Sequence, residues 1–210
     1  MPASRTPAIL QRLSLPLAAL AAALFAGGVI SGWLTYQSRS PLLRHHLPGT
    51  SAWWPHIILA AAACVVLGYA RWRRPGRGRR PGRLWLLAPF GQAAGRRIAR
   101  TVRAALRGPA GAGRALVALP LAAVFGYSFY RAGEQVIGGL DPNFTVNAWG
   151  GPSYLGAMSC HYLDCFLMAA VASWLLAKIL MPDPAGQEPA TAPPLAARSA
   201  VGARCDDGGQ

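Results

Sequence analysis

Residues Tyr154 to Met181 read YLGAMSCHYLDCFLMAAVASWLLAKILM, and this stretch decides the fold. It is long and apolar enough to cross a bilayer, because a hydrocarbon core needs about 20 helical residues at about 1.5 Å rise per residue. Its first half nevertheless carries His161 and Asp164, with Cys160 and Cys165 beside them. The stretch therefore predicts a membrane-spanning helix that contains a polar patch.

The composition of the whole chain agrees with a membrane protein. Hydrophobic residues make up 53% of the 210 residues and charged residues 13%, and the apolar residues come in long blocks. Arginine, alanine, glycine and proline are abundant together, as in proteins from GC-rich genomes, so the placement of the arginines is more informative than their number. The four cysteines have neither zinc-site spacing nor the pattern of a disulfide framework.

Three earlier apolar blocks predict three more spanning helices. We expect spans at residues 15–36, 55–72, 115–133 and 154–181. A basic leader precedes the first block, as in a signal peptide, but the block is longer than the apolar region of most signal peptides. Gly28 and Gly32 have the GxxxG spacing that lets two helices approach closely, although small residues are common throughout this chain. The predicted fold is an all-α, polytopic membrane protein built as a bundle of four transmembrane helices.

The distribution of arginine predicts the topology. Residues 71–114 hold thirteen arginines and no acidic residue, so the inner loop at 73–114 is expected in the cytoplasm. The basic leader at 1–14 and the proline-rich tail at 182–210 are expected on the same side, the tail as a disordered segment. The loops at 37–54 and 134–153 then lie outside. These features predict a multi-pass protein of the plasma (inner) membrane with both termini in the cytoplasm.

Residues 92–107 of the inner loop have the period of an amphipathic helix. Its basic stripe consists of Arg96, Arg100, Arg103 and Arg107, and apolar residues occupy the other side. The pattern is typical of a helix in the membrane interface, where each basic residue near an anionic leaflet contributes about 1 kcal/mol. We expect anionic lipids of the inner leaflet as partners. An acidic protein partner is an alternative, and nucleic acid is not favoured, because the chain has no recognisable nucleic-acid-binding module.

One face of the last predicted span carries side chains of the types that can coordinate a metal. These are Met158, His161, Asp164, Cys165 and Met168. Thioether, thiolate and imidazole groups suit copper, or zinc if the carboxylate takes part, and haem is a further candidate cofactor. His45, His46 and His56 are expected near the same side of the membrane. The alternative is that methionine and cysteine here are ordinary packing residues.

The same helix also predicts a buried polar cluster. An aspartate near the middle of a bilayer costs about 2.5 to 3.5 kcal/mol, so Asp164 should have a partner. The cluster is expected to consist of Arg131, Glu134, His161 and Asp164, with Arg131 neutralising Asp164 across two helices. A third interpretation is a proton or solute pathway in which His161 and Asp164 exchange protons, because histidine titrates near physiological pH.

No catalytic motif is present in the sequence. Cys160 or Cys165 with His161 has the composition of a nucleophile and a base, but neighbours on one helix point in different directions. We therefore do not expect an enzyme. The sequence favours an accessory or structural membrane component that acts with a membrane-protein partner or as a homo-oligomer. The alternative is a protein that handles a metal, protons or a solute through His161 and Asp164.

Overall fold

The computed structural model describes residues 13–72 and 85–183, and every named element in these ranges is helical. The elements are α1 (Leu15–Gln37), α2 (Trp54–Trp72), the 3-10 helix η2 (Trp85–Phe90), α3 (Gln92–Ala105), α4 (Pro109–Gly138), α5 (Pro142–Thr145) and α6 (Tyr154–Ile179). The prediction of an all-α fold is confirmed for this part of the chain. Nearly all of the basic leader, the first arginines of the inner loop and nearly all of the tail lie outside the described residues.

Three helices are long and apolar enough to cross a membrane. They are α1, α4 and α6, with 23, 30 and 26 residues. Helix α2 occupies the remaining predicted span, at 55–72, but its apolar part, Trp54–Tyr69, is shorter than these three. The prediction of a polytopic membrane protein is therefore supported by three helices, and the fourth span stays a prediction.

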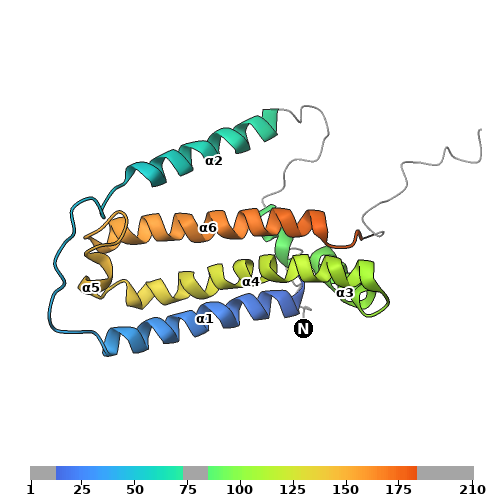
Figure 1. Cartoon of the computed structure of the whole chain (residues 1–210), viewed down its shortest axis with the longest axis horizontal. Helices are drawn as coiled ribbons and strands as arrows, with labels where there is room; N and C mark the ends of the chain where they lie inside the picture. Colours follow the sequence, from blue (N-terminus) through green and yellow to red (C-terminus); the bar gives the residue numbers. More distant parts are fainter. Residues whose placement is uncertain (1–12, 73–84, 184–210) are drawn as a thin grey trace, which may run out of the picture.

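The helices lie roughly along one axis and alternate in direction (Figure 1). Helices α1 and α4 lie side by side and run the same way, and α6 packs against α4 in the opposite direction. Helix α2 runs in the same direction as α6 and packs much more sparsely against it than α1 packs against α4. The result is a layered core of α1, α4 and α6, with α2 diverging from it.

The contact between α1 and α4 is close because both helices lack side chains there. A Cβ atom at Gly28 would collide with the carbonyl of Tyr130, and one at Gly32 would collide with the carbonyl of Glu134. A Cβ atom at Gly133 would meet the carbonyl of Phe25 in the same way. The GxxxG spacing of Gly28 and Gly32 thus has a packing role, since only glycine allows the two backbones to approach this closely.

Local signals explain where the helices at the loop end begin. The Ser153 side chain accepts a hydrogen bond from the Gly156 amide at 3.2 Å, which caps the first turn of α6. The Asp141 carboxylate accepts from the Asn143 amide at 2.9 Å and caps α5. Helix α4 starts with Pro109 at its first position, where the missing N–H is not needed, and continues to Gly138, beyond the predicted span at 115–133.

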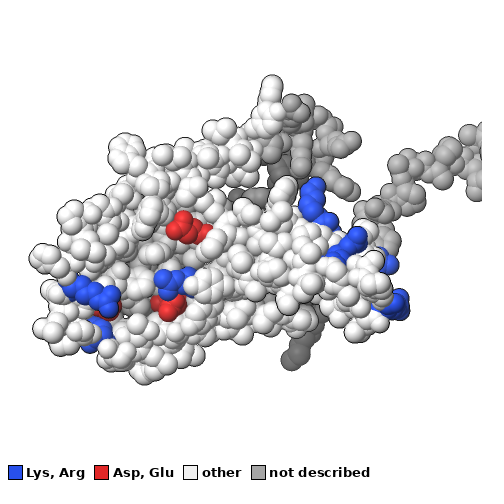
Figure 2. All heavy atoms as spheres, viewed as in Figure 1, with Lys and Arg blue, Asp and Glu red and all other residues white. Residues whose placement is uncertain are grey.

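Charged side chains gather at the two ends of the molecule and at one place between them (Figure 2). The surface between these places is uncharged in this view, as expected of helices that face lipid. Arg131 and Glu134 of α4 and Asp164 of α6 lie within helices that are long and apolar enough to span a membrane, and each of them has a polar partner.

Candidate functional site

Asp164 of α6 is paired with His56 of α2. His56 Nε2 lies 3.1 Å from Asp164 Oδ2, and the histidine is 94% buried while 41% of the aspartate side chain is exposed. The His56 ring also meets the Trp149 ring edge-on, with 5.1 Å between the ring centroids. The pair fixes the first turn of α2 against the middle of α6. His56 was expected only to lie on the same side of the membrane as the other histidines, so this contact was not foreseen.

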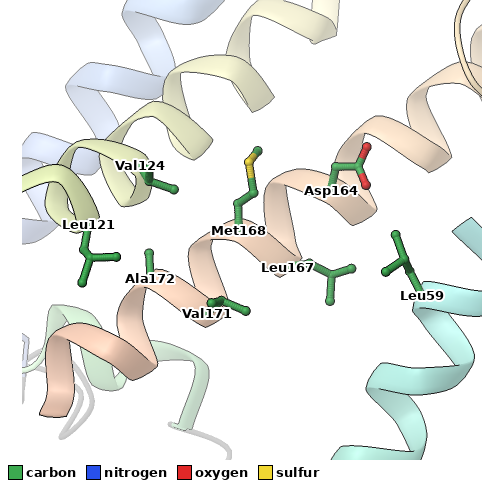
Figure 3. A pocket seen from close by; sticks show the side chains of 8 residues that line it. All are labelled: Leu59, Leu121, Val124, Asp164, Leu167, Met168, Val171 and Ala172. Atoms are coloured by element: carbon green, nitrogen blue, oxygen red, sulfur yellow. The ribbon is translucent and has the colours of Figure 1, made fainter.

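The exposed side of Asp164 faces a groove between α2, α4 and α6 (Figure 3). The groove has a volume of about 380 Å³, and its other lining residues are apolar: Leu59 from α2, Leu121 and Val124 from α4, and Leu167, Met168, Val171 and Ala172 from α6. A carboxylate is thus placed at the wall of an otherwise apolar groove. Such a combination of a mostly apolar lining with one polar group is typical of ligand sites.

Among the described residues, no ion pair joins Arg131 to Asp164, the partner expected from the sequence. Its guanidinium forms an ion pair with Glu134, one turn further along α4, and lies 5.5 Å from the centre of the Phe144 ring. The pair of Arg131 with Glu134 is favoured because the two side chains are three residues apart on one helix, so neither has to extend to another helix. Three residues of the predicted cluster therefore take part in two separate contacts: Arg131 forms an ion pair with Glu134, and Asp164 contacts His56, which was not part of the predicted cluster.

His161 contacts an aromatic ring in this structure. Its ring centroid lies 5.7 Å from that of Phe144, on the short helix α5. Arg131 approaches the same Phe144 ring, so this phenylalanine lies in contact with both basic side chains. No hydrogen bond among the described residues joins His161 to Asp164, the two residues of the alternative interpretation as a proton pathway.

The residues of the predicted metal face are divided between two surroundings. Met158 is buried in an apolar cluster with Ala148 and Ala157, and Cys165 is also buried. Met168 and Asp164 line the groove instead. Within residues 13–72 and 85–183, no group of three or more His, Cys, Asp or Glu side chains is placed to hold a metal ion. The described residues thus give no direct support for a copper or zinc site built from three such side chains.

The loop after α5 packs closely on the start of α6. Gly150 has a φ of +75°, and a Cβ atom there would meet the Gly156 carbonyl and the Cys160 sulfur. Gly156 in turn has no room for a side chain against the Gly150 carbonyl. The loop can therefore lie directly on α6, which holds Trp149 beside His56.

Two asparagines join the two connecting loops that precede α2 and α6. Asn143 accepts from the Arg44 amide at 2.6 Å and donates to the carbonyls of Ser40 and Leu42. Asn147 accepts from the Leu47 amide at 2.8 Å and donates to the His45 carbonyl. Each amide side chain satisfies both donors and acceptors of the facing backbone, and the loop that leads into α2 is held in place.

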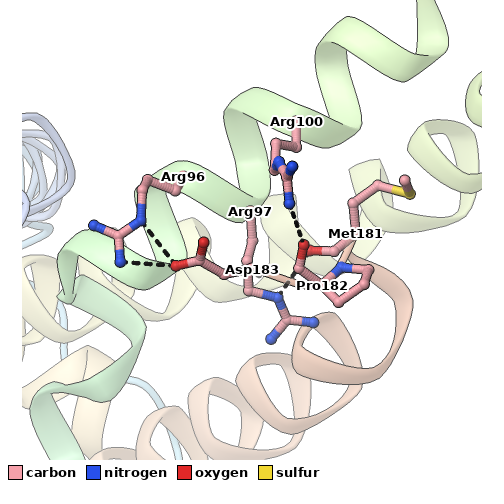
Figure 4. A network of polar contacts seen from close by, with 6 residues as sticks. All are labelled: Arg96, Arg97, Arg100, Met181, Pro182 and Asp183. Atoms are coloured by element: carbon pink, nitrogen blue, oxygen red, sulfur yellow. Dashed lines mark hydrogen bonds and ion pairs between the residues drawn. The ribbon is translucent and has the colours of Figure 1, made fainter. Parts of the chain in front are cut away.

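The basic side chains of α3 bind the end of α6 (Figure 4). Arg97 donates to the carbonyls of Ala177, Leu180 and Met181, at 2.6, 2.9 and 3.1 Å. Arg96 pairs with Asp183 at 2.7 Å, and Arg100 donates to the Pro182 carbonyl at 2.9 Å. These arginines donate hydrogen bonds at the end of α6, where the last carbonyls of a helix have no partner within the helix itself.

The stripe expected to bind lipid is thus divided by these contacts. Arg96 and Arg100 contact the segment after α6, while Arg103 donates to the Ala99 carbonyl of its own helix. All four arginines of the stripe, Arg107 included, are exposed. Arg97, outside the predicted stripe, makes the most extensive contact of the group. The sequence indicated that a basic side chain could bind the carbonyl end of a helix, because cations are favoured there. It did not indicate which helix would end beside Arg97.

No protein family model matches the chain, and no curated protein or solved structure matches it either. The described part of the chain is helical, and three of its helices are long and apolar enough to span a membrane.

Proposed function

We propose that this protein is an accessory component of the cell membrane, in which α2 is a fourth spanning helix that packs against a helix of a partner membrane protein. The observation that carries the proposal is the apolar surface of α2. Ile58, Val65 and Val66 are all more than 60% exposed, and this helix packs sparsely on the rest of the chain. An apolar helix with uncovered sides is expected to lie in lipid or against another membrane helix.

The directions of the helices support four crossings. Helices α1, α2, α4 and α6 alternate in direction, which is the arrangement that a chain crossing a membrane four times would have. Both ends of such a chain would lie on the side of the arginine-rich loop, which the positive-inside rule places in the cytoplasm. The apolar part of α2 is short, so its crossing would use the aromatic residues Trp54 and Trp72 at the two interfaces.

Small residues give α2 a surface that another helix can approach. Ala60, Cys64 and Gly68 follow one another at intervals of four residues, the spacing of Gly28 and Gly32 in α1. Cys64 and Gly68 are exposed, and a Cβ atom at Gly68 would meet no other atom within 4 Å. In α1 the corresponding surface is filled by α4. In α2 it is open, and a partner helix would fill it by the same close approach.

Helix α3 is suited to the inner membrane surface in this proposal. Ile98 and Val102 are exposed on it and Leu106 is exposed directly after its end, while Arg103 on the helix and Arg107 after it are also exposed. Apolar side chains entering the leaflet and arginines at the anionic head groups would place the helix in the interface. Its bonds to the end of α6 would then hold that helix at a fixed depth.

The partner can be detected by a photo-crosslinker attached to Cys64 in native membranes. This position is exposed on α2, and a matched control carries the crosslinker at Val117, which is exposed on α4. The proposal predicts one discrete protein adduct from Cys64 that disappears when Gly68→Ile obstructs the small-residue surface. An adduct with the mass of two copies of this chain would identify a homo-oligomer instead. Lipid adducts alone from both positions would contradict the proposal.

A further inference from the structure

We propose that the groove between α2, α4 and α6 binds a lipophilic cation, an ammonium or phosphonium ion with apolar substituents, whose charge lies at Asp164. The proposal rests on the groove itself and does not depend on a partner for α2. Its lining provides one carboxylate and seven apolar side chains. Its volume of about 380 Å³ lies in the range of small-molecule sites.

The charges around the groove leave one negative charge without a counterion. Arg131 is paired with Glu134, so these two residues together contribute no net charge. Asp164 contacts His56 through Oδ2, and no hydrogen bond in the described part of the chain reaches Oδ1. The free oxygen belongs to a side chain that is 41% exposed. It is therefore accessible to a molecule in the groove.

His56 is expected to be neutral in this arrangement. Its Nδ1 atom is buried and has no hydrogen-bond partner among the described residues. If the ring were protonated, Nδ1 would carry a hydrogen with no acceptor, which is more costly to bury than an unused lone pair. The neutral ring donates from Nε2 to Asp164 and fixes the orientation of the carboxylate, while the negative charge of Asp164 remains uncompensated.

The surroundings of this charge select the class of ligand. Asp164 lies ten residues after Tyr154, the first residue of α6, which is about 15 Å along the helix at about 1.5 Å per residue and close to the middle of a spanning helix. A carboxylate in such a place is strongly stabilised by a positive charge. Because Leu121, Val124 and Val171 line the groove, the cation should carry apolar groups that cover these side chains. An anion of the same shape would be repelled.

The test measures binding of radiolabelled tetraphenylphosphonium to the full chain in detergent by equilibrium dialysis. Tetraphenylborate, an anion of nearly the same shape, is the competitor that separates charge from hydrophobicity. The proposal predicts saturable binding of about one cation per chain, with no displacement by tetraphenylborate. No saturable binding, or equal competition by the borate, would overturn it.

Three variants locate the binding. Asp164→Asn removes the charge and keeps the shape, and it should weaken binding at least tenfold. Val171→Trp places a large ring in the groove while Asp164 stays, and it should also weaken binding, which gives a second result if Asp164→Asn does not fold. Asp183→Asn is the matched control, because this aspartate pairs with Arg96 at the other end of the molecule. Unchanged affinity in either of the first two variants, measured on protein with a wild-type melting transition, would contradict the proposal.

Discussion

Helices α1 and α2 are both apolar and both carry small residues at intervals of four, yet they are held in different ways. Gly28 and Gly32 of α1 lie against the backbone of α4, and the Tyr130 hydroxyl adds a hydrogen bond to Ser31 at 2.8 Å. Helix α2 touches α6 through His56 and Asp164, and the position of Gly68 is open. One helix is fixed by backbone approach, and the other is tied by a polar pair near its start.

The difference shows that apolar surface by itself does not hold a helix in a membrane bundle. Lipid tails are as apolar as leucine, so a helix gains little from exchanging lipid for another apolar side chain. What holds α1 is close van der Waals contact over a smooth surface, and what holds α2 is a hydrogen bond to a carboxylate. The first kind of contact is sensitive to any added volume, and the second to the loss of one side chain.

The largest effect is expected from adding volume between α1 and α4. Gly32→Leu would place a side chain against the Glu134 carbonyl and separate the two helices, at a cost of about 3 kcal/mol or more. Thermal unfolding of the purified protein in detergent measures the loss. Gly27→Leu is the matched control, because a Cβ atom at Gly27 meets nothing within 4 Å. Equal melting temperatures for the two variants would show that the α1–α4 contact is not close.

A second effect extends the comparison to α3, which is held to α6 by a charged side chain. Arg97→Ala would remove the donors to three carbonyls at the end of α6, and should lower stability by about 2 kcal/mol. Hydrogen exchange of the last turn of α6 should rise in parallel. Arg103→Ala is the control, since Arg103 contacts only its own helix through the Ala99 carbonyl among the described bonds. Faster exchange in the control alone would contradict the role of Arg97.

The contact between His56 and Asp164, which holds α2 against α6, should contribute less to stability than either of these contacts. His56→Ala is expected to lower stability by about 1 kcal/mol or more, because it removes the hydrogen bond to Asp164 and the ring contact with Trp149 while it leaves the α1–α4 contact intact. A double-mutant cycle with Asp164→Asn isolates the pair, and a coupling energy of about 0.5 kcal/mol or more is expected. A spin label on Cys64 should report greater mobility of α2 in His56→Ala. Additive losses in the cycle would mean that the pair does not couple the two helices.

The smallest expected effect is a gain in stability, and it distinguishes the small-residue surface of α2 from that of α1. Gly68→Ala should stabilise the isolated chain by about 0.5 to 1 kcal/mol, because alanine favours a helix and the added methyl meets no atom. Gly32→Ala should destabilise it, because the same methyl collides with the Glu134 carbonyl. Paired melting curves of the two variants test the comparison. Destabilisation by both would show that α2 packs inside the isolated chain.

Several features could be predicted from short segments of sequence. Hydropathy and length indicated the helices that became α1, α4 and α6, since a spanning helix satisfies its backbone hydrogen bonds within one segment. The period of residues 92–107 indicated α3, which forms at Gln92–Ala105. The location of α3 in the interface and the cytoplasmic position of the termini remain predictions, because they concern the membrane and not the chain alone.

The partners of the polar residues could not be predicted in the same way. The sequence indicated that Asp164 needs a partner, and it selected Arg131 because that residue lay on a neighbouring span at a similar depth. The structure pairs Asp164 with His56, which is 108 positions away, and pairs Arg131 with Glu134. The choice depends on how far α2 approaches α6 and on Trp149, which the loop holds beside His56.

The sequence by itself determined the all-α class, three apolar helices and the need for a polar contact inside α6, because each follows from composition or spacing within one segment. Only the tertiary structure decided that α4 covers the surface at Gly28 and Gly32, that Arg97 binds the end of α6, and that Asp164 faces a groove. The physical reason is that lipid makes the apolar faces of a helix nearly equivalent. Which face is covered then depends on matching surfaces and polar groups from segments far apart in the chain.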